Sequence, residues 1–408
     1  MLTQLFPKVH SQYTSSPVAP LLESFADWLA TEGYVKSTIC VFLFHLRRAL
    51  ERAGSCSSTR RFVDSDVDAY FKPWTDDRTS RSVKRIFQRF LLARDQVTVE
   101  PDSANFAPVL RDYATYLRET RGLAKNTIKN HLISISAFLS FASPHDNELD
   151  SLTPHVIEAF LISLAKRAKR QSIDLTVSHL RTFFRFCHDR GEIAQRLDYI
   201  DRACTYRGEL PPRALPWGLL LRFLSSIDRT DRTGCRDYTI LYLLAHYGLR
   251  PCEVASLAID AIDWKAKTLR VEQSKNHSIL DLPLSDEALQ VLRDYLSENR
   301  PTSSHRYLFL CAKAPVHQLT NHAIARIYKI RAQRSGLLLY GSSVYSLRHS
   351  FAMRLMERGV AVKTIGDLLG HHTLQSTCTY LRLHVEALRE VALPLPAGCD
   401  RGECHEDF

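Results

Sequence analysis

The sequence lacks the features of a membrane or secreted protein. Nowhere in its 408 residues does an apolar run approach the roughly 20 residues that a membrane-spanning helix needs. The first residues, MLTQLFPKVHSQYTSS, do not contain the apolar core of a signal peptide. The ten cysteines follow no regular spacing, which argues against a disulfide framework and favours a reducing cytosol. We therefore expect a cytoplasmic protein without a membrane partner.

Clustered metal ligands are also scarce. Cys399, Cys404 and His405 stand close together, but they are only three candidates and lie on a polar terminus. Structural zinc sites almost always use four ligands. We therefore predict no metal site and no cofactor.

The charge balance is the first positive signal. The 54 Lys and Arg residues exceed the 44 Asp and Glu residues, which gives a net charge of +10 and a pI near 9.1. A surplus spread over the whole chain favours a polyanionic partner, with nucleic acid first. By charge alone, a basic protein with no such partner remains an equal alternative.

The first half of the chain contains a repeat of nearly 90 residues. Residues 22–39 match residues 109–128, with Phe25 opposite Tyr113 and Leu29 opposite Leu117. The match continues further on, where residues 83–87 parallel residues 180–184. Apolar residues recur at three- and four-residue spacing in both copies, which predicts two bundles of about four short helices. Their aromatic residues are expected to form the cores.

The second half of the chain has a different pattern. Three prolines and a glycine between residues 203 and 216 mark an extended connection. Beyond it, two apolar runs around a polar tip at residues 273–278 predict a β-hairpin. The expected helices are 217–228, 236–247, 286–298, 319–335, 346–358 and 361–369, the expected strands are 268–272 and 279–284, and residues 381–391 form a final amphipathic run.

Four short motifs, in order, carry chemistry. Residues 247–257 read YGLRPCEVASL, and Lys275 stands at the hairpin tip, eight residues before Pro283. Leu347-Arg-His and Leu369-Gly-His follow, and Tyr380 stands nine residues after His371. Arginine offers a planar fork of donors for phosphate oxygens, histidine can transfer protons near neutral pH, and a tyrosine hydroxyl can be a nucleophile. Together these residue types could carry out nucleophilic attack on a phosphodiester.

These motifs resemble the two arginine boxes of the tyrosine recombinase (phage integrase) family. The resemblance is strong over residues 215–385, residues 105–200 are similar to the family's helical core-binding domain, and residues 20–100 look like a second copy of it. The fold class it implies is mainly α with a small β-hairpin or sheet. The implied domains are an extra N-terminal helical unit (1–102), a SAM-like core-binding domain (103–203), a linker (204–216), an α+β catalytic domain (217–391) and a flexible tail (392–408).

The resemblance also implies the roles of individual residues. Arg250 and Arg348 would stabilise negative charge on the attacked phosphate in place of a metal ion, and Glu253 would support the site. Lys275 would protonate the departing 5′ oxygen, and His371 would hydrogen-bond the phosphate. Tyr380 would attack phosphorus and form a 3′-phosphotyrosine, so that rejoining needs neither ATP nor metal.

One position departs from the family. Tyr345 stands where the family usually has histidine, and a tyrosine with a pKa near 10 is a poor base at neutral pH. His349, next to Arg348, is an uncertain substitute because it points to another side of a helix.

The leading hypothesis is a site-specific recombinase that acts on double-stranded DNA, in integration or transposition of a mobile element. By resemblance it would be associated with the nucleoid and act as a homo-tetramer on two DNA sites, or together with related recombinases. A DNA-binding relative that has lost cleavage is one alternative, supported by Tyr345. A type IB topoisomerase-like or hairpin-resolving enzyme is another. The candidates for DNA contact in the helical units, each with a merely solvated side chain as its alternative, are Lys36, Lys84, Arg85, Lys125, Lys129, Arg181 and Arg185.

Overall fold

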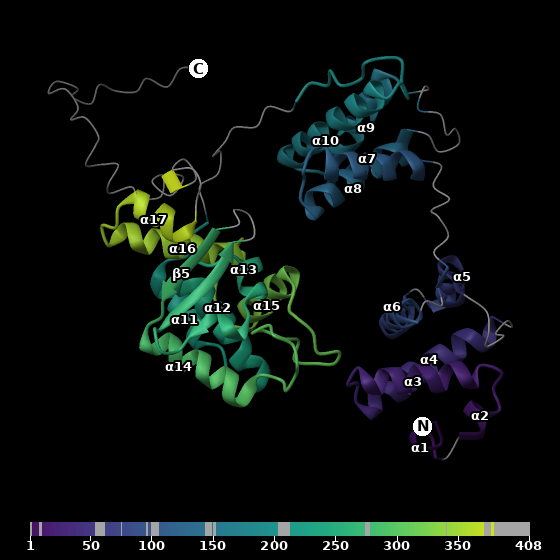
Figure 1. Cartoon of the computed structure of the whole chain (residues 1–408), viewed down its shortest axis with the longest axis horizontal. Helices are drawn as coiled ribbons and strands as arrows, with labels where there is room; N and C mark the ends of the chain where they lie inside the picture. The colour runs from purple at the N-terminus through teal and green to yellow at the C-terminus, as the bar shows by residue number, and fades with distance from the viewer. Residues whose placement is uncertain are drawn as a thin grey trace, which may run out of the picture. The chain divides into compact units, whose positions relative to one another are not determined.

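The computed structural model describes residues 2–7, 10–53, 62–74, 76–94, 97–98, 106–142, 149, 152–202, 213–273, 278–339, 341–370 and 377–378. The fold is mainly helical with one small three-stranded sheet (Figure 1). The chain divides into two compact units, one of Met1–Ala26 with Cys40–Arg207 and the other of Asp27–Ile39 with Gly208–Phe408. Among the described helices, none has the length and apolar character to cross a membrane.

The N-terminal helices pack around a core of phenylalanines. They are α1 (Leu2–Leu5), α2 (His10–Thr14), α3 (Ala19–Thr31), α4 (Lys36–Arg52), α5 (Asp64–Phe71) and α6 (Arg78–Ala93), with the short parallel strands β1 (Phe62–Val63) and β2 (Val97–Thr98) and the 3-10 turn η1 (Lys72–Trp74). The rings of Phe25, Phe87 and Phe90 lie within 6.0 Å of one another, centroid to centroid, and all three are fully buried.

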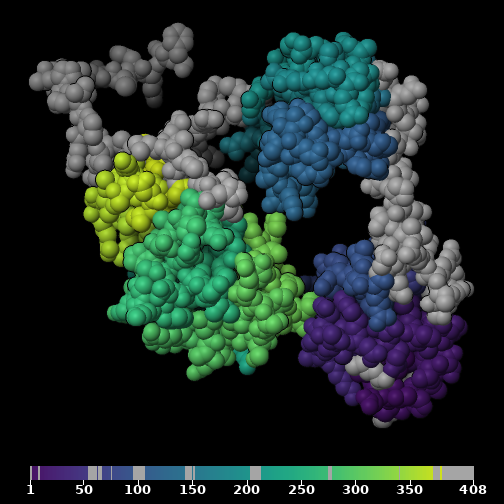
Figure 2. Space-filling model, viewed as in Figure 1, coloured from purple at the N-terminus to yellow at the C-terminus, as the bar shows by residue number. Residues whose placement is uncertain are grey.

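The next four helices repeat this arrangement. They are α7 (Ala107–Glu119), α8 (Lys125–Ala142), α9 (Pro154–Ala165) and α10 (Arg170–Asp189), and the space-filling view shows them, blue to teal, packed into one body (Figure 2). Tyr113 and Leu117 are fully buried like their partners Phe25 and Leu29, and Phe184 is buried like Phe87. The prediction of two four-helix bundles is confirmed, with α1 and α2 added to the first.

The second bundle contains a buried histidine pair. The rings of His131 and His179 lie 3.9 Å apart, and Tyr113 Oη is 2.9 Å from His131 Nδ1. Burial, and next the neighbouring His179 and Arg121, lower the pKa of His131 to about 4, and burial lowers the pKa of His179. Both rings are therefore neutral at physiological pH.

Because of this histidine pair, we expect the stability of the bundle to fall at acidic pH. The unfolded chain takes up a proton on His131 near pH 6.5 but the folded chain only near pH 4, and the pKa of His179 is lowered as well, so stability falls as the pH drops between those values. The loss for His131 is about 3 kcal/mol at most. Thermal unfolding followed from about pH 7.5 to pH 5 should show this slope, and His131→Gln should reduce it. The exposed His155→Gln is the control; an equal slope in both variants would contradict the assignment.

The C-terminal unit is built on one central helix. Around α12 (Arg232–His246) pack α11 (Trp217–Ser225), α13 (Pro251–Ser256), α14 (Asp286–Asp294) with the π-helical turn η4 (Tyr295–Asn299), α15 (Asn321–Arg334) and α16 (Val344–Glu357), and α17 (Val362–Leu369) packs on α16 (Figure 1). The sheet consists of β3 (Ile262–Asp263), β4 (Thr268–Gln273) and β5 (Ser278–Pro283), all antiparallel, with Leu269 opposite Leu282.

The predicted elements of this unit are present, with three differences. The helix expected to begin at residue 236 begins at Arg232, because the Asp231 side chain caps the backbone N–H of Gly234. Both α13 and the edge strand β3, preceded by the 3-10 turn η3 (Ile259–Ala261), were not predicted. These elements are too short to show a periodicity in the sequence. The predicted helical run at residues 381–391 lies outside the described residues.

A buried ion network ties α12 to α15. Asp237 Oδ1 accepts hydrogen bonds from Arg236 Nε and Nη2, and Asp237 Oδ2 accepts from Arg331 Nε at 2.8 Å. All three side chains are buried. Removing the carboxylate leaves two buried cations without their counter-charge.

We expect Asp237→Ala to lower the free energy of unfolding by about 3–5 kcal/mol, measured by urea denaturation. The matched control is Asp286→Ala, which breaks the exposed pair between Lys267 Nζ and Asp286 Oδ1 and should cost less than about 1 kcal/mol. Equal losses in the two variants would mean that the buried network contributes no more than a surface pair.

Candidate active site

Arg250 is held at the start of α13 by a single carboxylate. Its backbone is extended, Pro251 begins the helix, and Glu253 lies in the first turn. Glu253 Oε2 accepts a hydrogen bond from the Arg250 backbone N–H, and Oε1 accepts from Arg250 Nη1, both at 2.7 Å. Because Glu253 is only 1% exposed, this pairing fixes the direction of the guanidinium group. Glu253 thus braces Arg250.

Arg348 links the two chain segments that flank it in space. It lies on α16 and is 7% exposed. Its Nη1 donates to the Gly248 carbonyl and its Nη2 to the Leu369 carbonyl, both at 2.6 Å. Gly248 has φ +62°, and a Cβ there would collide with the Phe351 ring. Only glycine can therefore present this carbonyl to Arg348 without strain.

The two arginines meet at the end of α17. Arg348 binds the carbonyl of Leu369, and Arg250 Nη2 reaches the next carbonyl, that of Gly370, at 3.5 Å. Gly370 ends the helix in the left-handed conformation (φ 62°, ψ 51°). The C-terminal end of a helix carries partial negative charge, which favours nearby cations. The fold thus holds two guanidinium groups at consecutive peptide units directly before His371.

The end of β4 reaches the same place. Gln273, its last residue, is buried, and a Cβ on Gly370 would collide with its side-chain amide. Ser278 Oγ, at the start of β5, donates to Gln273 Oε1 at 3.2 Å. Gln273 was not predicted as part of the site. The strict alternation of buried Leu269, Val271 and Gln273 along β4 is the signal that would have found it.

Three of the predicted site residues lie outside the described residues: Lys275, His371 and Tyr380. Their sequence neighbours are nevertheless placed. Gln273 and Ser278 flank the segment that carries Lys275, and Gly370 precedes His371. Thr377, three residues before Tyr380, is fully buried, and a Cβ on Gly366 of α17 would lie 2.9 Å from its Oγ1. Thr377 therefore packs against α17.

Tyr345 faces another surface. It is 47% exposed, and its hydroxyl makes no hydrogen bond with any other described residue. It lines a hollow of about 530 Å³ between α15 and the segment before α16, whose apolar walls include Leu337 and Leu339. His349 is half-buried, and burial, followed by the charge of Arg348, lowers its pKa. His349 is therefore neutral at pH 7 and can accept a proton only at more acidic pH.

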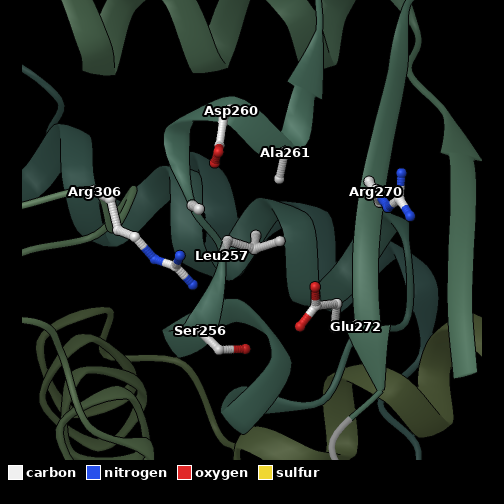
Figure 3. Close-up of a pocket in the computed structure, with 8 residues that line it drawn as sticks. Ser256, Leu257, Asp260, Ala261, Arg270, Glu272 and Arg306 are labelled. Carbon is white, nitrogen blue, oxygen red and sulfur yellow. The ribbon is translucent and has the colours of Figure 1, made fainter. Parts of the chain in front are cut away.

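A second, polar hollow lies at the other end of α13. It measures about 310 Å³ and is lined by charges of both signs. Asp260, Glu272 and Arg306 point toward it, while the guanidinium of Arg270 points away (Figure 3). Neither Arg250 nor Arg348 lines it, so this hollow is separate from the arginine site. Among the described residues, no group of three or more His, Cys, Asp or Glu side chains could hold a metal ion.

Three of the four lysines predicted for DNA contact are exposed in the first turns of helices. Lys36 is the first residue of α4, Lys125 is the first residue of α8, and Lys129 follows one turn later. Lys36 and Lys125 occupy matching positions of the repeat.

The two predicted arginines of α10 are partly engaged in packing. Arg181 Nε donates to the Asp198 carbonyl at 3.0 Å, and Arg185 Nε and Nη2 each lie 3.3 Å from Asp198 Oδ2. Burial alone would raise the pKa of the Asp198 carboxyl, but hydrogen bonds from Arg196 and Arg185 outweigh it and lower that pKa. Arg181 and Arg185 therefore fasten the segment after α10 to the helix.

Comparison with known proteins finds matches for the second helical bundle and for the C-terminal unit. The model of the phage integrase family matches residues 220–387, which include Arg250 and Arg348, and that of the phage integrase N-terminal SAM-like domain matches residues 110–191. The putative integrase/recombinase y4rA of Sinorhizobium fredii is 28% identical over 95% of this chain and 96% of its own length. The tyrosine recombinase XerA of Pyrococcus furiosus is 30% identical over 69% of this chain and 92% of its own.

The structural comparison agrees. A lambda integrase, solved as a tetramer bound to a Holliday junction, superposes with a TM-score of 0.55 over 74% of this chain and 86% of its own, at 21% identity. The fold is that of a lambda integrase-like tyrosine recombinase, with a helical domain before the α+β unit. The chain belongs to the phage integrase family, whose members cut and rejoin DNA.

Proposed function

We propose that this protein is a site-specific DNA recombinase that cuts and rejoins DNA through a 3′-phosphotyrosine intermediate. The observation that carries the proposal is the convergence of Arg250 and Arg348 on the consecutive carbonyls of Leu369 and Gly370, directly before His371. Two guanidinium groups fixed side by side match the non-bridging oxygens of one phosphate.

The reaction balances without an external energy source. The Tyr380 hydroxyl loses its proton to water and attacks phosphorus, the bond from phosphorus to the 5′ oxygen breaks, and Lys275 gives that oxygen a proton. Arg250, Arg348 and His371 stabilise the extra charge of the five-coordinate phosphorus. The phosphotyrosine ester retains the bond energy, so attack by a 5′ hydroxyl reverses the step with neither ATP nor a metal ion.

The wider biological setting is part of the same proposal. Double-stranded DNA is the partner, and a homo-tetramer would join two DNA sites, by analogy with the lambda integrase tetramer bound to a Holliday junction. Integration or transposition of a mobile element is the role that we propose, with the protein at the nucleoid in the cytoplasm. The domains run over residues 1–102, 103–203, 217–391 and the tail 392–408, with the linker at 204–216.

Tyr345 favours a second candidate function, a DNA-binding relative without cleavage. Its exposed hydroxyl makes no hydrogen bond with any other described residue, and it stands where the family usually has a histidine. In the cleaving enzyme, the proton of Tyr380 would have to leave by another route, such as water.

A nicked substrate separates the two functions. Duplexes bound by the full chain can be selected from a random pool, and a nick placed close to the cut lets the short fragment diffuse away after cleavage. We expect a DNA–protein adduct that survives denaturation. Tight binding with no adduct would reject the enzyme in favour of the DNA-binding relative, and relaxation of supercoiled DNA without strand exchange would favour a topoisomerase.

A further inference from the structure

The N-terminal bundle exposes a row of arginines that the proposed catalytic function does not use. The row consists of Arg78, Arg81, Arg85 and Arg89 on α6 and is called the arginine face. Helix α6 contains five basic residues and no acidic one. Spacings of three and four residues place the row on one side of the helix, and all four side chains are exposed. The buried residues Val83, Phe87 and Phe90 occupy the opposite side.

The helix that carries the arginine face is rigidly fixed. Its buried side packs into the phenylalanine core, and Asp77 caps its start by accepting from the backbone N–H groups of Thr79 (3.1 Å) and Ser80 (2.9 Å). Lys84, on the flank of the helix, pairs with Asp68 at 2.6 Å and ties α6 to α5. The arginine face is therefore held in a fixed direction.

Two carboxylates contact α6 among the described residues, and neither pairs with Arg78, Arg81 or Arg85. Asp77 is engaged by the helix cap and Asp68 by Lys84. The guanidinium groups of Arg78, Arg81 and Arg85 make no hydrogen bond or ion pair with any described residue. Three exposed cations on one side of a well-packed helix create a positive potential that attracts an external polyanion.

We infer that the arginine face binds the phosphate backbone of double-stranded DNA, so that the N-terminal bundle is a second DNA-binding unit. From residue 78 to residue 89 the row spans about 16 Å along the helix. The major groove of B-DNA, about 12 Å wide, admits one α-helix between two rows of phosphates. Arginine forks bind phosphates in a sequence-independent way. The inference rests on the proposed function in one respect, that DNA is the protein's substrate.

The structure also argues against a membrane surface as the polyanion. A membrane-binding amphipathic helix buries its apolar side in the lipid. On α6 the apolar side packs into the core of the bundle itself, where Val83, Phe87, Phe90 and Leu91 are fully buried. Apart from Leu92, which is 59% exposed, the outer side of the helix therefore presents mainly its arginines.

The test is the salt dependence of binding by the full chain. The probe is a fluorescent random-sequence duplex several helical turns long, titrated by anisotropy at a series of KCl concentrations. Each phosphate contact contributes about 0.9 to the slope of log K against log salt. We expect the slope of Arg78→Gln/Arg81→Gln/Arg85→Gln to be smaller by about 3, and affinity at about 0.1 M salt to fall at least tenfold.

A matched pair of single variants sharpens the test. Arg85→Gln should reduce the slope by about 0.9, whereas Arg94→Gln should leave it unchanged. Arg94 follows the same helix, but its guanidinium lies 5.0 Å from the centre of the Phe90 ring, on the core side. An unchanged slope in the triple variant, with unfolding curves like those of the native chain, would overturn the inference and assign the arginine face to an acidic protein.

The nicked substrate separates this inference from the proposed function. At saturating protein, the triple variant should still form the covalent adduct, because its arginine site is intact. A native chain that forms no adduct would reject the proposed function and leave the comparison of slopes valid. A triple variant with normal adduct formation and a normal slope would reject only the role of the arginine face.

Discussion

Tyr380→Phe is expected to abolish the covalent DNA–protein adduct while leaving DNA affinity within about twofold of the native value. Phenylalanine keeps the ring but removes the oxygen that would attack phosphorus, and no covalent step is possible without a nucleophile. The loss should exceed about 10⁴-fold in rate and reach the detection limit, since the nucleophile and its proton acceptors act as one unit. Denaturing gels of the nicked duplex measure the adduct, and anisotropy measures the affinity.

Tyr307→Phe provides the control for this substitution. Tyr307 lies in the same unit, and its hydroxyl makes no hydrogen bond with any other described residue, so loss of that oxygen should leave adduct formation unchanged. Adduct that persists in Tyr380→Phe would show that a different side chain is the nucleophile. Mass spectrometry of the DNA-linked peptide would identify that residue.

Arg348→Lys is expected to slow cleavage by about 10²–10³-fold, the loss typical when one donor to a transition-state oxygen is removed. The guanidinium reaches two carbonyls at once, those of Gly248 and Leu369, each at 2.6 Å. A lysine ammonium is a compact charge and cannot span both. One buried carbonyl would lose its partner, which costs about 1–3 kcal/mol of stability. Single-turnover cleavage at saturating protein measures the rate, and urea denaturation measures the stability.

Arg354→Lys is the matched control on the same helix. Arg354 lies over the Trp217 ring, 3.8 Å from its centre, away from the two carbonyls. Its substitution should change the cleavage rate by less than about threefold. Cleavage by a folded Arg348→Lys variant at the native rate would mean that Arg348 only fastens α16 to α17 and does not contact the phosphate.

The fold was largely predictable because its signals are local. Two bundles followed from three- and four-residue spacing, and their equivalence followed from matched pairs such as Phe25 with Tyr113. The hairpin followed from two apolar runs around a polar tip. The elements that the sequence missed, α13 and β3, are held by contacts with distant segments, such as the hydrogen bond from Leu308 N–H to the Leu257 carbonyl at 2.8 Å.

The site divides in the same way. The pairing of Arg250 with Glu253 spans only three residues and is a local contact at the start of α13. The contact between Arg348 and Gly248 spans 100 residues, and no spacing rule indicates it. Likewise Arg181 and Arg185 were predicted as surface cations. Only the folded chain shows that Asp198, 13 residues beyond Arg185 in sequence, engages both of them.

The sequence by itself determined the family, the residue types of the site, the repeated bundles and the basic character of the chain, because motifs, periodicity and charge are properties of neighbouring residues. The tertiary structure decided where the arginines meet. It directs Arg348 and Arg250 to the adjacent carbonyls of Leu369 and Gly370 and turns Tyr345 toward another surface. It also leaves three cations of the arginine face without a counter-charge among the described residues. These outcomes depend on packing between segments far apart in the chain, which local pattern does not encode.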